Sequence, residues 1–130
     1  MEIDRPDIVA EVTAAFERYE RALVGNDVQT LNALFHPDPR TIRYGGAENL
    51  YGHHAIAVFR TARSPTGLAR TRSRTVITTY GRDVAVASTL FHRPSVPGKI
   101  GRQMQTWVRF EEGWRIVAAH VSMIDETPSR

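Results

Sequence analysis

Three polar side chains occupy positions in predicted helices and strands where they are candidates for chemistry. Tyr19 falls on the apolar stripe of the first predicted helix, Arg43 lies in a short predicted strand, and His120 lies near the end of the last predicted strand. A phenol can donate a proton, a guanidinium can hold a carboxylate through two parallel hydrogen bonds, and an imidazole titrates near neutral pH. These residue types are suited to acid–base chemistry on a small anion.

Tyr19 belongs to a helical stripe that the sequence predicts to be buried. In the segment "DIVAEVTAAFERYERALVGND", Ile8, Val12, Phe16, Tyr19 and Leu23 recur at steps of three or four, as on one face of an amphipathic helix. A buried phenol needs a partner for its hydroxyl. Tyr19 is therefore either a core residue bonded to a backbone carbonyl or part of a cavity wall, where its phenol acts as a donor or proton relay.

Arg43 has two interpretations as well. In the predicted strand "RTIRYGG", alternation gives Thr41 and Arg43 one face and gives Ile42 and Tyr44 the other. If Ile42 faces the helices, Arg43 is solvated. An inward Arg43 would be costly to bury without an anionic partner, so it would need a carboxylate from Glu48 or from a ligand.

The last predicted strand, "WRIVAAHVSMI", carries His120 and Ser122 on an otherwise apolar face. Alternation predicts one face that changes from bulky to small to polar along the strand, and its members are Trp114, Ile116, Ala118, His120 and Ser122. We expect this face to line a cavity, with its polar end toward a ligand. A lone histidine in such a place can also be a core residue with both ring nitrogens satisfied.

The preceding strand, "IGRQMQTWVRF", also offers two faces. One carries Gln103, Gln105, Trp107 and Arg109, and the other carries Arg102, Met104, Thr106, Val108 and Phe110. We expect the second face, beyond Arg102, to be the core. The face with Trp107 and the two amides is either a dimer surface or the pocket, and alternation alone leaves both open.

The order of predicted elements defines the fold class. Helices are expected over residues 7–25, 28–35 and 53–63, a short strand over 40–46, a loop over 47–52, and four strands over 69–80, 84–93, 100–110 and 114–124. This is an α+β fold in which a curved antiparallel sheet wraps around a long N-terminal helix, with two shorter helices. We expect a single domain over residues 1–130, with a conical cavity open at one end.

Composition excludes several classes of function. There is no cysteine, so no disulfide and no thiolate chemistry is available. No secretory signal or membrane span is recognisable, and a cytoplasmic location with no membrane partner is expected. No glycine-rich phosphate loop or nucleophile elbow is present. His53 and His54 are adjacent, and neighbouring residues on a helix diverge by about 100°, so we expect a surface pair and no metal site.

Arginine dominates the basic residues: among 17 lysines and arginines, Lys99 is the single lysine. Codon usage can explain this, and so can recognition of anions by guanidinium groups. Arg70, Arg72 and Arg74 in "RTRSRT" are predicted to share one solvated face of an edge strand. The net charge of +3 and the lack of interleaved aromatic residues argue against a nucleic-acid partner.

The element order and the closing W-x-I-x-x-x-H-x-S strand resemble the nuclear-transport-factor-2-like (NTF2-like, SnoaL-like) cone fold. Within it, "RYGGAENLYGHHAIAVFRTARS", "GLARTRSRTVITTYGRD" and "GRQMQTWVRFEEGWRIVAAHVS" resemble the oxalurate-catabolism group (HpxZ-type) and the dicarboxyurea hydrolase of cyanuric acid degradation (AtzH-type). The similarity runs from Val12 to Met123.

The resemblance implies a small cofactor-free decarboxylating amidohydrolase that converts 1,3-dicarboxyurea to allophanate and carbon dioxide. Its catalytic tyrosine and arginine correspond to Tyr19 and Arg43. The substrate-binding candidates beside this pair are Tyr44, Glu48, Gln105, His120 and Ser122. The alternative is a non-catalytic module that binds a small acid or associates with an amidase; an isomerase or cyclase ranks last, because no inward aspartate is evident. A small anionic substrate, a link to an amidase and a homodimer are expected, the last partly because Trp107 lies on a sheet face.

Overall fold

The computed structural model describes residues 1–127, which form three helices and six strands. In chain order the elements are α1 (Pro6–Val24), α2 (Val28–Leu34), β1 (Ile42–Tyr44), β2 (Asn49–Tyr51), α3 (His53–Ala62), β3 (Thr71–Tyr80), β4 (Val84–His92), β5 (Lys99–Phe110) and β6 (Gly113–Asp125).

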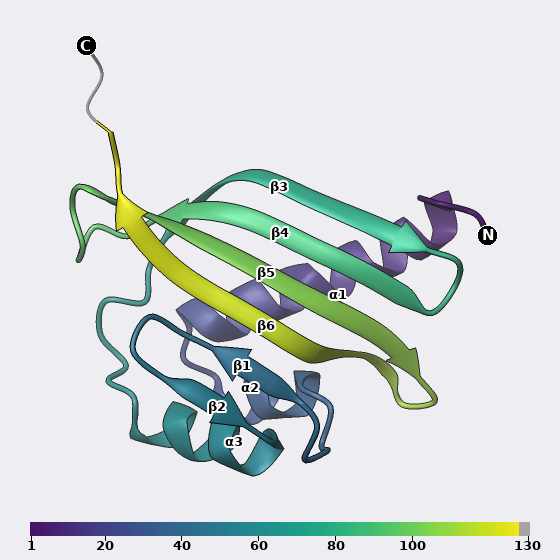
Figure 1. Ribbon diagram of the computed structural model, residues 1–130, viewed down its shortest axis with the longest axis horizontal. Helices are drawn as coiled ribbons and strands as arrows, with labels where there is room; N and C mark the ends of the chain where they lie inside the picture. The colour runs from purple at the N-terminus through teal and green to yellow at the C-terminus, as the bar shows by residue number, and fades with distance from the viewer. Residues whose placement is uncertain (128–130) are drawn as a thin grey trace.

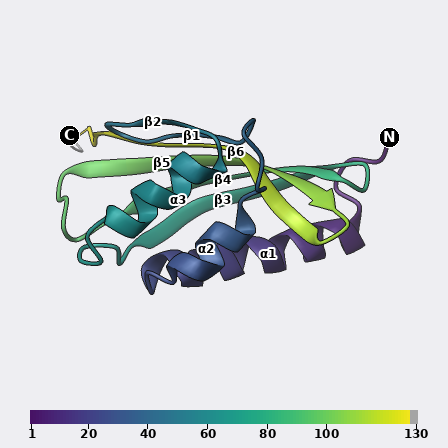
Figure 2. The same ribbon diagram turned by 90° about the horizontal axis from the view of Figure 1, so that it is seen from below.

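The strands make one curved sheet in the order β2-β1-β6-β5-β4-β3 (Figure 1). All neighbouring strands are antiparallel except β1 and β6, which are parallel. The three helices lie on the same side of the sheet, with α1 beneath its long strands (Figure 2). The predicted α+β fold class, with a curved sheet around a long first helix, is confirmed.

The helix α1 forms as its apolar stripe predicts. Pro6 stands at its first position, where its missing N–H is not needed, and the Gly25 N–H closes the other end by donating to the Arg21 carbonyl. All five predicted stripe residues are buried. This burial fixes the rotation of the helix, so Tyr19 faces the underside of the sheet.

The strand β2 was expected to be a loop. It pairs with β1 through Arg43 and Leu50, and the Gly45 N–H donates to the Glu48 carbonyl at 2.9 Å, which closes a tight hairpin. The strand is three residues long, too short for an alternating pattern to reveal it. Its consequence is that Glu48 is brought back over Arg43.

The prediction that His120 and Ser122 face the cavity is wrong, because β6 contains a bulge. Trp107 of β5 pairs with Ile116, but Thr106, the residue directly before it, pairs with Ala118 and skips Val117. Val117 is thus an extra residue that reverses the alternation. Trp114 and Ile116 point inward as expected, but beyond the bulge the inward side belongs to Ala119, Val121 and Met123.

The two faces of β5 are also the reverse of what was expected. The side chains of Gln103, Gln105 and Trp107 are at most 1% exposed and face the helices, whereas Met104 is 55% exposed. The Trp107 Nε1–H donates to Gln105 Oε1 at 3.1 Å, and Gln103 Oε1 accepts from Arg70, whereas the Gln105 Nε2 has no partner among the described residues. Trp107 therefore no longer supports a homodimer, which stays a prediction from the sequence.

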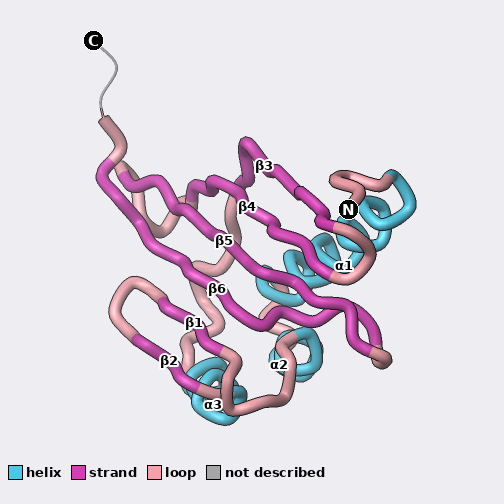
Figure 3. The backbone as a smooth tube through the Cα atoms, turned by 45° about the vertical axis from the view of Figure 1, so that its right-hand side comes forward, coloured by secondary structure: helices cyan, strands magenta, loops and turns pink. Residues whose placement is uncertain are grey.

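The apolar core lies between α1, α2 and the middle of the sheet, where Trp107, Ile116 and Phe16 are buried together. The tube in Figure 3 shows α3 standing apart from α1, beneath β1 and β2. The region between these two helices and the sheet is where the polar residues of the interior gather. Among residues 1–127, no helix is long and apolar enough to cross a membrane.

Candidate functional site

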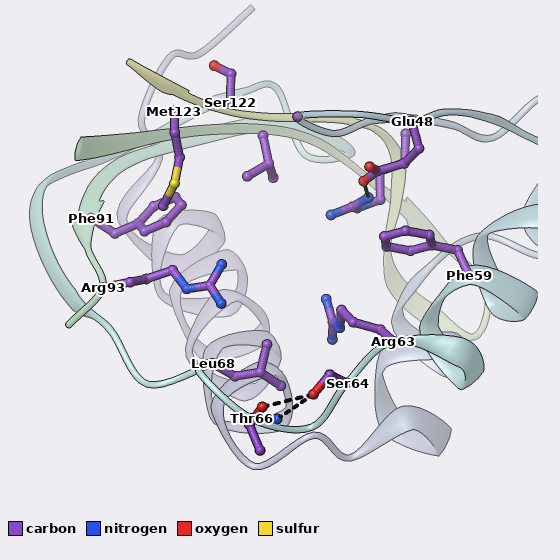
Figure 4. A pocket seen from close by; sticks show the side chains of 13 residues that line it. Glu48, Phe59, Arg63, Ser64, Thr66, Leu68, Phe91, Arg93, Ser122 and Met123 are labelled. Atoms are coloured by element: carbon purple, nitrogen blue, oxygen red, sulfur yellow. Dashed lines mark hydrogen bonds and ion pairs between the residues drawn. The ribbon is translucent and has the colours of Figure 1, made fainter. Parts of the chain in front are cut away.

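Two adjoining cavities open beneath the sheet between α3, the segment after it and the end of β4. The outer cavity has a volume of about 540 Å³ and the inner chamber about 70 Å³. Both are lined by the same six residues, Arg43, Arg63, Leu68, Phe91, Arg93 and Val121. They therefore form one funnel with a narrow inner end, as the sequence predicted for a cone, and Figure 4 shows the side chains that line its outer part.

Tyr19 forms part of the wall of the inner chamber and is 2% exposed. Arg43, which the first short strand supplies, lines the same chamber. Two residues that are far apart in the sequence are thus brought to one small space. The cavity-wall interpretation of Tyr19 applies, and the inward interpretation of Arg43 replaces the solvated one.

Arg43 is 7% exposed and has the carboxylate partner that an inward position requires. Its Nη1 donates to Glu48 Oε1 at 2.9 Å, and its guanidinium lies 5.3 Å from the centre of the Phe59 ring. Its Nε is buried without a hydrogen-bond partner. Gly45 makes the ion pair possible, because a Cβ there would lie 1.8 Å from Glu48 Oε1.

A second ion pair borders the inner chamber. Arg70 donates to both carboxylate oxygens of Glu20 and, at 3.0 Å, to Gln103 Oε1. Its guanidinium stacks 4.3 Å from the centre of Phe91, whose ring packs closely over Gly101. The prediction of a solvated arginine face is therefore wrong for Arg70, whose side chain is 4% exposed.

The other arginines of "RTRSRT" do not share one solvated face either. Arg72 forms a bidentate pair with Glu17, with distances of 2.9 and 3.0 Å. Arg74 sits at an irregularity in the pairing of β3 with β4, has a φ of 50° and is exposed. The β3 irregularity interrupts the alternation on which the prediction rested.

Arg60 is a buried cation behind the inner chamber. It is 1% exposed, and none of its three guanidinium nitrogens has a hydrogen-bond partner. The guanidinium lies 4.8 Å from the centre of the Phe35 ring and 5.9 Å from that of Tyr19. Burial lowers the pKa of Arg60, because the charged form loses its hydration.

The arginines shift the acidity of the Tyr19 phenol. Burial by itself raises the pKa of Tyr19, but the charges of Arg60, Arg43 and Arg70, in decreasing order of effect, outweigh it. The net result is a Tyr19 pKa below the ordinary value of 10.0. A phenol in this setting is a stronger acid than a free tyrosine, and its anion is stabilised by the surrounding guanidinium groups.

We expect Arg60→Met to stabilise the fold. The stacking of a desolvated cation on an aromatic ring contributes about 2 kcal/mol, whereas removing an ion from water costs several kcal/mol. Replacing this unpaired cation by an apolar side chain of similar length should raise the free energy of unfolding by about 1–4 kcal/mol. Thermal denaturation checks this, with Arg60→Lys as the control that keeps a buried charge. A lower melting temperature for Arg60→Met than for the wild type would contradict it.

Two further arginines line both parts of the funnel and were not singled out in the sequence. Arg63 follows directly after α3, and Arg93 follows directly after β4. A signal for Arg60 and Arg63 exists in their spacing of four and seven positions after Ile56, which is the helical period of the buried side of α3, with Arg63 just past its end. Arginines on a short helix are normally solvated, so this spacing alone does not predict a site.

The substrate-binding candidates divide between the two sides of the sheet. Glu48 lines the outer cavity. Tyr44 and His120 lie on the opposite side, where their rings meet edge to face at 6.3 Å, and the Tyr44 and Tyr51 hydroxyls are 2.9 Å apart. Their predicted role in substrate binding is therefore wrong, because Arg43 takes the inward place in β1 and the bulge in β6 turns His120 outward.

Ser122 and Gln105 are not placed as substrate ligands either. Ser122 borders the outer cavity, but its hydroxyl points away from it (Figure 4) and accepts a hydrogen bond from Arg102 Nη2 at 3.0 Å. Gln105 is 1% exposed, in the core, and lines neither part of the funnel. The amide that borders the inner chamber is that of Gln103, two residues earlier on the same strand.

The two histidines at the start of α3 point to different surroundings. His53 Nε2 is 2.8 Å from the Asn32 carbonyl oxygen, and His54 is exposed. Residues 1–127 contain no group of three histidine, cysteine or acidic side chains arranged to hold a metal ion. The polar groups of the funnel are guanidinium groups, a phenol, a carboxylate, an amide and the hydroxyls of Ser64 and Thr66.

The fold belongs to the NTF2-like, cystatin-like class of cone folds. A cystatin-like fold protein from Burkholderia xenovorans is 51% identical, with 98% of this chain and 99% of that chain covered and a TM-score of 0.94. An NTF2-like superfamily protein from Salmonella enterica is 26% identical, covers 94% of both chains and gives a TM-score of 0.75.

Within that class, the chain belongs to the AtzH-like family, whose family model matches residues 1–127. A protein of unknown function from Pectobacterium atrosepticum is similar over 95% of both chains, with 59% identity and a TM-score of 0.92. A comparison with curated proteins finds no match. The resemblance seen in the sequence is thus confirmed at the level of fold and family.

Proposed function

We propose that the protein is a cofactor-free decarboxylating amidohydrolase that acts on a carboxylated urea of the 1,3-dicarboxyurea kind. The observation that carries the proposal is the meeting of Tyr19 and Arg43 in one arginine-lined chamber. The phenol can donate the proton that the nitrogen of a carbamate needs to lose carbon dioxide, and the guanidinium can bind and orient the carboxylate. Membership of the AtzH-like family supports the same substrate class.

The reaction needs one proton and no nucleophile from the protein. The bond between a terminal urea nitrogen and its carboxylate carbon breaks, and its electron pair stays on nitrogen. Tyr19 gives its phenolic proton to that nitrogen, carbon dioxide leaves, and allophanate remains with one carboxylate. The dianionic substrate and the neutral phenol become a monoanion and a tyrosinate, so charge is conserved. Solvent then returns a proton to Tyr19.

The arginines around Tyr19 contribute in two ways. Arg43 orients the substrate through its carboxylate, which is a positioning effect present before and during bond cleavage. The charges of Arg60, Arg43 and Arg70 stabilise the tyrosinate that develops as the proton leaves. Because this second interaction is stronger in the transition state than in the ground state, it accelerates the chemical step.

A second function has support from a specific observation. Arg63 lines both parts of the funnel and has buried nitrogens without partners, so it favours an anion there whether or not a reaction follows. A module that binds a small acid without turnover, or that serves a neighbouring amidase, would use the same funnel. The two functions differ in their need for Tyr19, since binding an anion requires no proton donor.

The test is the release of carbon dioxide from dicarboxyurea generated in situ, measured with and without the wild-type protein. The proposal requires that the protein accelerates the spontaneous loss of carbon dioxide and that allophanate accumulates in equal amount. If the rate of carbon dioxide release is unchanged when the protein is saturated with dicarboxyurea, the proposal is contradicted and the binding module is favoured.

A further inference from the structure

The funnel holds more positive charge than its own carboxylates compensate. Glu48 pairs with Arg43 at 2.9 Å, and Glu20 pairs with Arg70. Arg63 and Arg93 line both parts of the funnel, yet neither forms an ion pair with a carboxylate within residues 1–127. Two uncompensated cations in a partly dry cavity indicate a site adapted to negative charge that the protein itself does not provide.

The two side chains are placed to act together. Arg63 and Arg93 come from different sides of the outer cavity, and their guanidinium groups point into it (Figure 4). Arg93 is held in place because its Nε and Nη2 both donate to the Gly67 carbonyl, the former at 2.7 Å. The Arg63 Nε and Nη2 are buried without a hydrogen-bond partner. An anion between the two guanidinium groups would give both a counter-ion that the described residues do not supply.

The charge of Arg63 persists at neutral pH. Burial, followed by the neighbouring charge of Arg60, lowers the pKa of Arg63 to about 10, which still leaves it protonated. The lowered pKa of Arg63 reflects first its loss of hydration and then the positive charges of neighbouring arginines. Binding of an anion would offset those charges, so the geometry and the electrostatics agree.

We propose that Arg63 and Arg93 form a second anion-binding pole, which holds the far carboxylate of the substrate while Arg43 and Tyr19 hold the reacting end. The assignment of the reacting end rests on the proposed function. The inner chamber, at about 70 Å³, accommodates one small group, and the outer cavity, at about 540 Å³, accommodates the rest of the molecule. The site thereby selects short acids with two anionic ends over those with one.

This arrangement also accounts for a reaction that stops after one step. Dicarboxyurea presents a carboxylate to each pole, but its product keeps a single carboxylate. Allophanate therefore engages one pole at a time and is held less tightly than the substrate. A second loss of carbon dioxide, which would give urea, is disfavoured because the product leaves before it can be turned and bound again.

Binding of two inert probes tests the proposal apart from any reaction. Glutarate carries carboxylates at both ends with a three-atom spacer, like dicarboxyurea, and glutaramate has the same length with one carboxylate replaced by a neutral amide. Calorimetric titration of the wild type should give at least a tenfold lower Kd for glutarate, since a hydrogen bond to a charged group is worth about 10- to 100-fold in affinity.

The variants Arg63→Gln and Arg93→Gln should lose most of this preference while their glutaramate affinity stays within about twofold, and Arg63→Lys should restore part of it. Arg18→Gln is the matched control, because Arg18 is exposed on α1 and lines no part of the funnel. Melting curves identify any variant that is unfolded. If Arg63→Gln is unfolded, Arg63→Lys replaces it in the comparison and should show a reduced preference for glutarate over glutaramate.

An equal affinity of the wild type for the two probes, or a full preference in Arg63→Gln and Arg93→Gln, would overturn the second pole. Tyr19→Phe separates this result from the proposed function. It should keep the glutarate preference, because the phenol is not part of the second pole. If Tyr19→Phe keeps full turnover and the glutarate preference, the proposed function is wrong and the second pole stands. If Tyr19→Phe loses turnover but the wild type shows no glutarate preference, the second pole is wrong and the proposed function stands.

Discussion

Replacing Tyr19 by phenylalanine should lower the kcat for carbon dioxide release by about 10²–10⁴-fold, the usual contribution of a positioned general acid. The change removes one oxygen atom from the wall of the inner chamber and leaves the ring packed among Phe35 and Arg60. The fold and the affinity for an inert diacid should therefore change little. The loss should appear in kcat, because the proton is needed only as the bond breaks.

The matched control is Tyr44→Phe. It makes the same chemical change on the other side of the sheet, where the Tyr44 hydroxyl bonds that of Tyr51 outside the funnel. We expect the control to retain wild-type turnover in the same assay. Equal rates for wild type and Tyr19→Phe would end the proposal that the phenol is the acid.

The second large effect is expected for Arg43→Gln. The variant loses the guanidinium that orients the substrate carboxylate, and it leaves Glu48, now unpaired, facing the incoming anion. We expect kcat/KM to fall by about 10²–10³-fold, which corresponds to about 3–4 kcal/mol for a bidentate pair between charged groups. Steady-state kinetics of carbon dioxide release measures this loss.

A double variant separates the two causes. In Arg43→Gln/Glu48→Gln the repelling carboxylate is neutral, so about tenfold of the lost kcat/KM should return, mostly through KM. The single variant Glu48→Gln keeps the guanidinium and should bind the substrate at least as well as the wild type. A double variant no better than Arg43→Gln alone would show that Glu48 does not oppose the substrate.

The helices and the long strands could be predicted from the sequence because each depends on local periodicity. The stripe of α1 identified Tyr19 as inward. Arg43 was different: alternation alone left its side undecided. Family resemblance favoured the inward side, and the structure supplies the physical reason, which is the carboxylate of Glu48.

The errors in β3 and β6 share a cause, because unbroken alternation predicts strand faces only where no bulge interrupts the pairing. The extra residue Val117 in β6 turns His120 and Ser122 outward and brings Val121 and Met123 into the funnel. No residue type in "RIVAAHVSMI" marks that bulge, since it arises from pairing with β5 and β1. On β5 the alternation holds but the expected core face is the exposed one, because Gln103 finds partners in distant segments, Arg70 and Glu20, and Gln105 accepts a bond from Trp107.

The most direct test of the central claim is the ionisation of Tyr19 itself, followed by the ultraviolet absorbance of tyrosinate across the alkaline range. One of the 4 tyrosines should ionise below the ordinary value of 10.0, and this transition should be missing in Tyr19→Phe. Because the acid must be protonated to act, kcat/KM should fall as pH rises through that same transition. In Arg60→Met the tyrosinate transition and the fall in kcat/KM should both move to higher pH. A wild type whose tyrosines all ionise at or above 10.0, or whose activity does not follow the transition, would contradict the account.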